Sequence, residues 1–90
     1  MRSEFHNDDV GYLEWLQRNP DGYVINCAPV ARAEYVILHR ARCHAITGDP
    51  SSGERWTSTY KKGCSDMQIE LELWTRSEVG VLPRPCGICL

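Results

Sequence analysis

A chain of 90 residues with a formal net charge of −2 is long enough for one small domain, and a domain of that size often needs a metal or a disulfide to stabilise it. Its 42% apolar and 24% charged residues exclude an intrinsically disordered chain. The sequence contains no apolar run of about 18 residues and no apolar signal-peptide core near its start, so we expect a cytoplasmic protein without membrane contact.

The first helix is predicted to follow Asn7-Asp8-Asp9, because Asn7 can cap free N–H groups and aspartates suit the positive end of a helix dipole. Residues 1–6 are expected to be a cloning-derived or disordered start, with a single domain over residues 7–90. Pro20 should end this helix near Arg18. Its inward stripe is expected to be apolar: Val10, Leu13 and Leu16, with Tyr12 and Trp15 beside it.

Three antiparallel strands are predicted from runs of β-branched and aromatic residues. They cover residues 22–27, 35–46 and 55–62, with Gly63 ending the third strand and Cys64 following it. The second strand should be a central strand covered on both sides, because its first half is apolar on both faces.

A second helix is predicted over residues 66–79, with Ser65 as the cap, Gln68 reaching back, and Met67, Leu71 and Trp74 facing inward. The same residues also alternate like a strand, but the cap and the good helix formers favour a helix. The sequence therefore predicts an α+β fold: a three-stranded antiparallel sheet, two helices and a C-terminal zinc knuckle.

The cysteines indicate a structural metal site. Cys86 and Cys89 have the Cys-x-x-Cys spacing that lets two sulfurs reach one ion, and Cys43 and Cys64 can complete a tetrahedral zinc site. His44 competes as a ligand, but neighbouring strand residues point to opposite faces, so it should not bind together with Cys43. Cys27 lies in an apolar run and is expected to be a free buried thiol.

Two other interpretations of the cysteines are less favoured. A disulfide framework usually has an even number of cysteines, whereas this chain has five. A redox pair normally begins a helix that lowers the thiol pKa, but only Leu90 follows Cys89.

A basic and aromatic middle segment suggests a nucleic-acid partner. Residues 29–63 carry a local charge of +3, although the whole chain is acidic. Cations can neutralise phosphates and aromatic rings can stack on bases or contact a methyl group. The candidate DNA contacts are Arg40, Arg42, His44, Arg55, Trp56, Tyr60, Lys61 and Lys62. The alternative is that the aromatic residues are core and the cations are simply solvated.

The order of motifs resembles a small domain family of Streptomyces and related actinobacteria. The segments that carry the resemblance are Asp8-Asp9-Val10-Gly11-Tyr12-Leu13-Glu14-Trp15-Leu16, Asn19-Pro20-Asp21-Gly22-Tyr23-Val24-Ile25-Asn26, Leu38-His39-Arg40-Ala41-Arg42-Cys43-His44-Ala45-Ile46, Trp56-Thr57, Tyr60-Lys61-Lys62-Gly63-Cys64, Glu72-Leu73-Trp74 and Cys86-Gly87-Ile88-Cys89. Such domains are associated with modification-dependent restriction and with binding of 5-methylcytosine in DNA. The resemblance implies that Cys43, Cys64, Cys86 and Cys89 act together.

These observations lead to the hypothesis of a non-enzymatic module that binds double-stranded DNA containing 5-methylcytosine, in a protein with a fused or associated nuclease domain. The net negative charge favours an alternative, a zinc-stabilised protein-interaction or accessory domain of a nuclease. A small thiol enzyme is a third possibility, in which Cys27 would pair with His39 or His44. It requires a thiol of depressed pKa.

Overall fold

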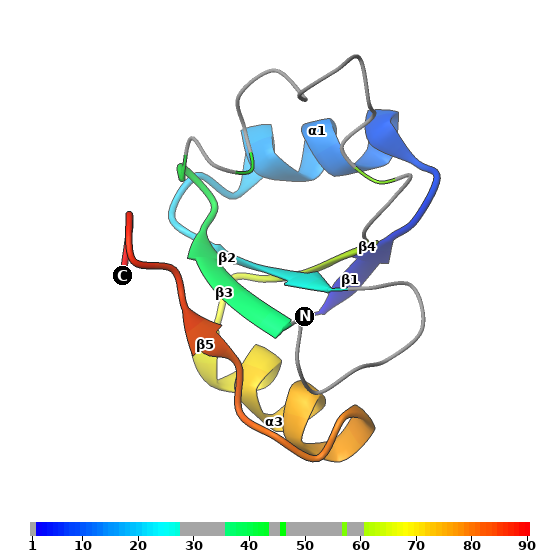
Figure 1. Cartoon of the computed structure of the whole chain (residues 1–90). Helices are drawn as coiled ribbons and strands as arrows, with labels where there is room; N and C mark the ends of the chain where they lie inside the picture. Colours follow the sequence, from blue (N-terminus) through cyan, green and yellow to red (C-terminus); the bar gives the residue numbers. More distant parts are fainter. Residues whose placement is uncertain (1, 28–35, 44–45, 47–56, 58–60) are drawn as a thin grey trace, which may run out of the picture.

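The computed structural model describes residues 2–27, 36–43, 46, 57 and 61–90, and it has the α+β architecture that the sequence predicts. A five-stranded sheet lies between two helices, α1 on one face and α3 on the other (Figure 1). The elements are β1 (Ser3–Phe5), α1 (Asp9–Arg18), β2 (Tyr23–Cys27), β3 (Val36–Arg40), β4 (Lys61–Ser65), α3 (Gln68–Glu78) and β5 (Arg84–Pro85).

The sheet has the order β1-β4-β2-β3-β5, so β2 is its central strand. β2 pairs antiparallel with both β3 and β4, and Val24 aligns with His39 on one side and Cys64 on the other. β1 pairs antiparallel with β4, whereas β5 pairs parallel with β3. The predicted count of three antiparallel strands was therefore wrong. The two additional strands are short edge strands without the alternating pattern that identifies a strand in a sequence.

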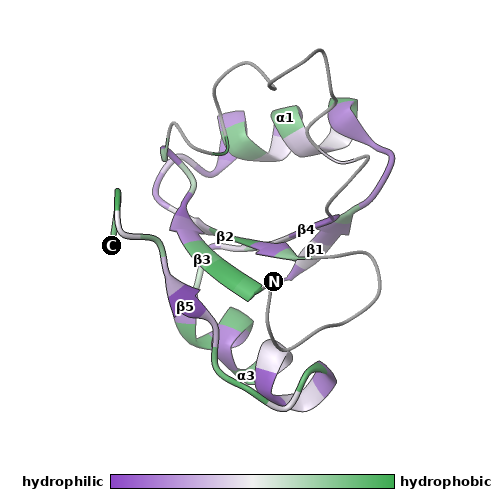
Figure 2. Ribbon diagram, in the orientation of Figure 1, coloured by the Kyte–Doolittle hydropathy of each residue, from purple (hydrophilic) through white to green (hydrophobic). Residues whose placement is uncertain are grey.

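Each face of the sheet carries its own buried cluster. Towards α3, Ile25, Leu38 and Leu71 pack with Val36 and Cys27. Towards α1, the buried residues are Tyr12, Val24, Ala41, Cys43, Ile46, Cys64 and Cys86. Figure 2 shows the hydrophobic colour running along β3, next to the hydrophilic β5. None of the helices in the described ranges is long and apolar enough to cross a membrane.

Helix α1 is rotated relative to the expected stripe. Val10 and Leu13 are 71% and 37% exposed, whereas Tyr12 is completely buried. The Tyr12 hydroxyl donates a 3.0 Å hydrogen bond to the Ile46 carbonyl. The helix is capped by Asp8, whose carboxylate accepts from the Gly11 N–H, rather than by Asn7. A buried tyrosine needs a hydrogen-bond partner for its hydroxyl, and Ile46 supplies one. The helix therefore buries Tyr12 instead of the stripe of Val10 and Leu13.

Helix α3 has the predicted type and begins two residues later than expected. The N-cap is Met67 rather than the predicted Ser65. The Ser65 hydroxyl donates to the Glu70 carboxylate at 2.7 Å and accepts from the Met67 N–H, so Gln68 is not its partner. Leu71 is buried as predicted, whereas Met67 is 53% exposed and was wrongly placed inward. Gly80, with a φ of 86°, follows the helix in the left-handed conformation that glycine adopts readily.

Strand β4 differs most from its prediction, because it continues through Gly63 and Cys64 to Ser65. The Trp74 side chain of α3 packs over Gly63, where an added Cβ would meet the ring at 3.1 Å. Because Gly63 has no side chain, the Trp74 indole can pack directly on the strand at this position, and the strand continues beyond it. Most of the predicted strand, residues 55–56 and 58–60, lies outside the described residues.

Candidate metal centre

One histidine and three cysteines converge at the end of β3. The ligand atoms of His39, Cys43, Cys86 and Cys89 all lie within 4.8 Å of one another. The first three residues are buried and Cys89 is half-buried. Imidazole nitrogen and thiolate sulfur are the donors of structural zinc sites, and four of them fill a tetrahedral shell.

A turn after β3 brings His39 and Cys43 together. In a continuous strand, residues four apart would be separated by about 13 Å, too far to share an ion. β3 instead ends at Arg40, and the Cys43 N–H donates to the Arg40 carbonyl at 3.0 Å. The predicted strand over residues 35–46 was therefore too long, and its early end makes the ligand pair possible.

The last six residues bring the other two cysteines to the same place. The Cys86 N–H donates to the Leu38 carbonyl at 2.8 Å, next to the β3–β5 pairing. The chain then turns, and the Leu90 N–H donates to the Cys86 carbonyl at 3.0 Å. Backbone N–H groups point at sulfur, among them Ile88 at Cys86 (3.4 Å) and Arg40 at Cys89 (3.3 Å). Such hydrogen bonds to ligand atoms orient a metal's first shell.

The pKa shifts of His39 and Cys86 favour the protonation states that bind a cation, a neutral imidazole and a thiolate. Burial, and secondarily the charge of Lys62, lowers the pKa of His39 to about 4, so its imidazole is neutral near pH 7. Its Nδ1 is buried without a hydrogen-bond partner in the described part of the chain. Burial opposes ionisation of Cys86, yet hydrogen bonds from Ile88 and Cys89 leave the pKa of this thiol lowered.

The spacing of two sulfurs also matches a shared ion. The Sγ atoms of Cys43 and Cys86 are 3.9 Å apart. Two thiolates at the usual zinc–sulfur distance in a tetrahedron are separated by about 3.8 Å. The described atoms therefore provide the donor types, the number of donors and the spacing of a closed structural site.

Cys64 does not join this group, although the sequence placed it there. It lies inside β4, and its row in the sheet runs from Cys64 through Val24 to His39. Two strand spacings, about 10 Å, separate it from β3. Cys64 is completely buried, and burial raises its thiol pKa. His39 takes the place that the sequence assigned to Cys64, and the His-x-x-x-Cys spacing was the signal that could have identified it. His44 lies outside the described residues.

Two of the predicted DNA contacts are exposed beside the metal centre. The Arg40 Nε–H donates to the Cys89 carbonyl at 3.0 Å, and its guanidinium carbon lies 6.0 Å from the Tyr23 ring centre. Arg42 forms a 3.1 Å ion pair with Asp21, and both side chains are well exposed, at 69% and 89%. Both arginines therefore lie at the surface, next to the turn that carries Cys43.

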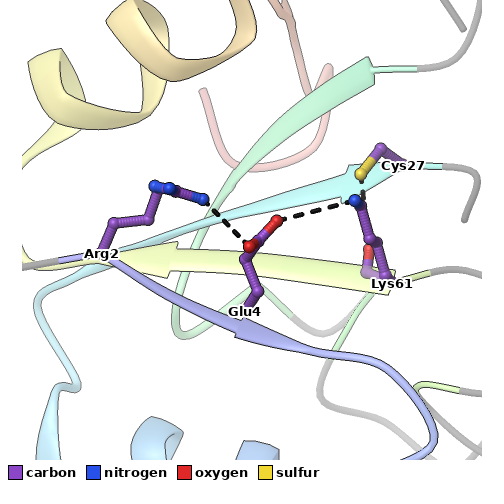
Figure 3. Close-up of polar contacts among 4 residues, drawn as sticks. All are labelled: Arg2, Glu4, Cys27 and Lys61. Atoms are coloured by element: carbon purple, nitrogen blue, oxygen red, sulfur yellow. Dashed lines mark hydrogen bonds and ion pairs between the residues drawn. The ribbon is translucent and has the colours of Figure 1, made fainter. Parts of the chain in front are cut away.

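The two lysines among the predicted contacts are engaged elsewhere. Lys62 is only 5% exposed, lies under α1, and donates to the Asn26 side-chain oxygen. Burial, partly offset by neighbouring thiols and Asp9, lowers its pKa to about 8. Lys61 points to the opposite face, where Glu4 bridges it to Arg2 (Figure 3). Lys62 is therefore buried, and Lys61 is paired with a carboxylate. Arg55, Trp56 and Tyr60 lie outside the described residues.

The Arg2–Glu4–Lys61 chain has a structural role. Glu4 contacts Arg2 at 3.2 Å and Lys61 at 3.6 Å, and both cations lie over the Trp74 ring, at 4.9 and 5.6 Å from its centre. These contacts link β1 and β4 to α3. Residues 3–5, which the sequence placed before the domain, form an edge strand of the sheet.

Cys27 lies on the α3 face, apart from the metal centre. Its thiol donates to the Lys61 carbonyl at 3.8 Å (Figure 3) and lines a cavity of about 230 Å³. Burial raises the pKa of Cys27 more than the nearby lysines lower it. A catalytic thiol needs the opposite shift, because the thiolate is the nucleophile.

No family model, curated protein or solved structure matches this chain. The resemblance to methylated-DNA-binding domains therefore stays a prediction from sequence.

Proposed function

We propose that this chain is a non-enzymatic DNA-binding module, stabilised by zinc and selective for DNA that contains modified cytosine. The observation that carries the proposal is the convergence of His39, Cys43, Cys86 and Cys89 beside two exposed arginines. The metal would stabilise the fold, and the arginines would contact DNA.

Zinc is the cation that this donor set fits best. Three thiols and one neutral imidazole form a soft, four-coordinate site, whereas magnesium and calcium require oxygen ligands. With four protein ligands the site leaves no open position for substrate or water, which supports a structural role. Because the site does not exist in the unfolded chain, binding of the metal contributes directly to folding.

The support for DNA comes from Arg40 and Arg42, together with the sequence resemblance. Both side chains are exposed and close to the end of β3. Two phosphate contacts predict a modest electrostatic term, with a slope of about −2 in the logarithm of affinity against the logarithm of salt concentration. The preference for modified cytosine comes from the resemblance alone.

The direct test is a fluorescence-anisotropy titration of the zinc-loaded chain with two duplexes of one sequence, one carrying 5-methylcytosine and one plain. The proposal predicts binding that weakens with added salt and is tighter for the methylated duplex. Equal affinity would remove the selectivity, and no binding to either duplex at low salt would contradict the proposal.

A second candidate, a protein-interaction module, is favoured by the outer side of α3. Met67, Ile69 and Leu73 are all at least half exposed, and Ile69 and Leu73 are one helical turn apart. Exposed apolar groups of this kind are frequent at protein interfaces. If this surface binds an associated nuclease domain, Leu73→Ser will abolish co-purification with that domain and leave the affinity for DNA unchanged. Unchanged co-purification would remove this candidate.

A further inference from the structure

The groove at the Arg40 end of the sheet has a composition suited to a phosphate. It has a volume of about 320 Å³ and lies between the turn before β2 and the turn after β3. The Ala41 N–H donates to the Gly22 carbonyl at 2.9 Å, which fixes the two turns relative to each other. The lining residues are Pro20, Asp21, Gly22, Tyr23, Arg40 and Arg42.

The polar groups of this groove favour an anion with several oxygens. Arg40 and Arg42 present planar guanidinium groups, whose paired N–H donors match the oxygens of a phosphate. Tyr23 adds a hydroxyl that can donate a further hydrogen bond. One carboxylate, Asp21, opposes these two cations, so the groove has a net charge of +1.

Asp21 is the acidic residue that lines this groove. It pairs with Arg42 at 3.1 Å, but both side chains are largely in solvent, where such a pair contributes little free energy. An incoming phosphate can therefore displace the carboxylate at small cost. The Asp21 charge still repels the phosphate, so Asp21 should weaken its binding.

Arg40 connects the groove to the metal centre. Its backbone N–H donates to the Cys89 sulfur, and its side-chain Nε–H donates to the Cys89 carbonyl. Cys89 belongs to the candidate ligand group. A metal that fixes Cys89 would also fix the acceptor that orients the Arg40 guanidinium.

From these contacts we infer that the Arg40–Arg42 groove is a phosphate-binding subsite whose affinity depends on the metal through Cys89. This inference rests on the proposed function, since it names the subsite and the control of DNA binding. The chemistry is that of a phosphate group, and the source is a nucleic-acid backbone or free phosphate.

The experiment follows the zinc-loaded chain by NMR, observing the Arg40 and Arg42 Nε–Hε signals during titration with inorganic phosphate and with a short duplex. Both signals are expected to shift with the duplex. A shift with the duplex at far lower concentration than with phosphate identifies the nucleic-acid backbone as the source, whereas equal concentrations identify a general phosphate site. If neither probe moves these signals, the inference is wrong.

Variants measured by anisotropy test each residue. Arg42→Gln should weaken duplex binding about tenfold, which corresponds to one lost charge-assisted phosphate contact. Asp21→Asn should strengthen binding. Arg18→Gln, which removes the same charge from an exposed residue outside the groove, is the matched control and should have a small effect. Equal loss in Arg42→Gln and Arg18→Gln would overturn the subsite but leave the proposed DNA function standing.

The coupling between the groove and the metal is tested with a variant and not by removing the metal, because metal removal can unfold the chain. Arg40→Lys keeps the charge and the metal ligands but lacks the Nε–H that reaches Cys89. We expect this variant to keep its zinc and to bind the duplex several-fold more weakly. Wild-type affinity in Arg40→Lys would contradict the coupling. If inorganic phosphate shifts the Arg40 and Arg42 signals but the chain does not bind the duplex, the groove is a phosphate subsite and the proposed DNA function is wrong.

Discussion

The two faces of the sheet are packed in different ways. Towards α3, the core consists mainly of Ile25, Leu38, Val36 and Leu71, whose burial needs no partner. Towards α1, the sheet also buries polar and sulfur-containing groups, namely the His39 imidazole, the Lys62 amine and several thiols. Hydrophobic burial can account for the α3 face, whereas the α1 face also contains the sulfur and nitrogen atoms of the candidate metal centre.

This contrast begins with adjacent residues of one strand. Val24 and Ile25 are both completely buried in β2, but Val24 belongs to the α1 cluster and Ile25 to the α3 cluster. Alternation along the central strand therefore separates the core that contains the candidate metal centre from the core that does not. A substitution on one face should therefore leave the other face unchanged, unless the two faces are coupled.

Removing the metal should have the largest effect. Structural zinc contributes on the order of 10 kcal/mol in small domains, comparable to the whole free energy of unfolding of a typical protein. A chelator, or Cys86→Ser, should therefore lower the melting temperature steeply. Hydrogen exchange should rise first at Ala41, Cys43 and Cys86, whose N–H groups bond beside the centre. An unchanged melting temperature after chelation would contradict a metal-stabilised core.

Truncating the opposite core should destabilise the chain without affecting the metal. Leu71 of α3 is completely buried against the sheet. Leu71→Ala should therefore lower the free energy of unfolding, measured by chemical denaturation, by about 2–5 kcal/mol. The exposed Leu73 of the same helix is the matched control, and Leu73→Ala should change stability by less than about 0.5 kcal/mol. Zinc affinity measured by competition should stay at the wild-type value in both variants. Weaker zinc binding in Leu71→Ala would show that the faces are coupled.

Lys62 should make the α1 face sensitive to pH. Burial lowers the pKa of Lys62 from 10.5 to about 8, which costs the folded state about 3 kcal/mol while the amine is charged. Below pH 8 the full cost applies. Between pH 8 and 10.5 the unfolded chain keeps the proton and the folded chain loses it, so this cost disappears as pH rises.

The variant Lys62→Met removes this cost, so its stability relative to wild type should fall steadily between pH 8 and pH 10.5. Urea unfolding of both proteins across that range measures the difference. Lys61→Met is the control on the other face. It should be less stable than wild type, because it loses the Glu4 ion pair and the Trp74 contact. A pH-independent difference for Lys62→Met would mean that the buried amine is not desolvated.

The smallest effect is expected for Tyr12→Phe. The variant keeps the ring but leaves the Ile46 carbonyl without its hydrogen bond, so it should cost about 1–2 kcal/mol. Thermal unfolding measures the loss, and zinc content should be unchanged. A neutral substitution would mean that water replaces the hydroxyl at this carbonyl.

The sequence predicted the elements that local chemistry determines. β2 and both helices follow from periodicity, turn residues and helix formers, and Cys86 and Cys89 follow from their spacing. It did not predict where β3 stops or that β4 continues through Gly63. These two boundaries depend on contacts between distant residues, namely Ala41 with Gly22 and Trp74 with Gly63. Both boundaries decide the ligand set, since one brings His39 to Cys43 and the other leaves Cys64 inside the sheet.

The surface was harder to predict than the core. The sequence placed Lys61 and Lys62 among the DNA contacts. It could not show that Lys62 is buried beneath Tyr12 or that Lys61 lies against Trp74. Arg40 and Arg42 were identified from the local positive charge of residues 29–63, although both were expected inside the second strand. Their link to Cys89 depends on the C-terminal segment folding back, which no local pattern indicates.

Native mass spectrometry of three proteins, after loading with zinc and buffer exchange, tests the ligand set most directly. We predict one zinc ion per chain in the wild type and in Cys64→Ala, and none or a readily lost ion in His39→Ala. If His39→Ala retains its ion while Cys64→Ala loses it, the four-cysteine set is correct and the centre described here is wrong.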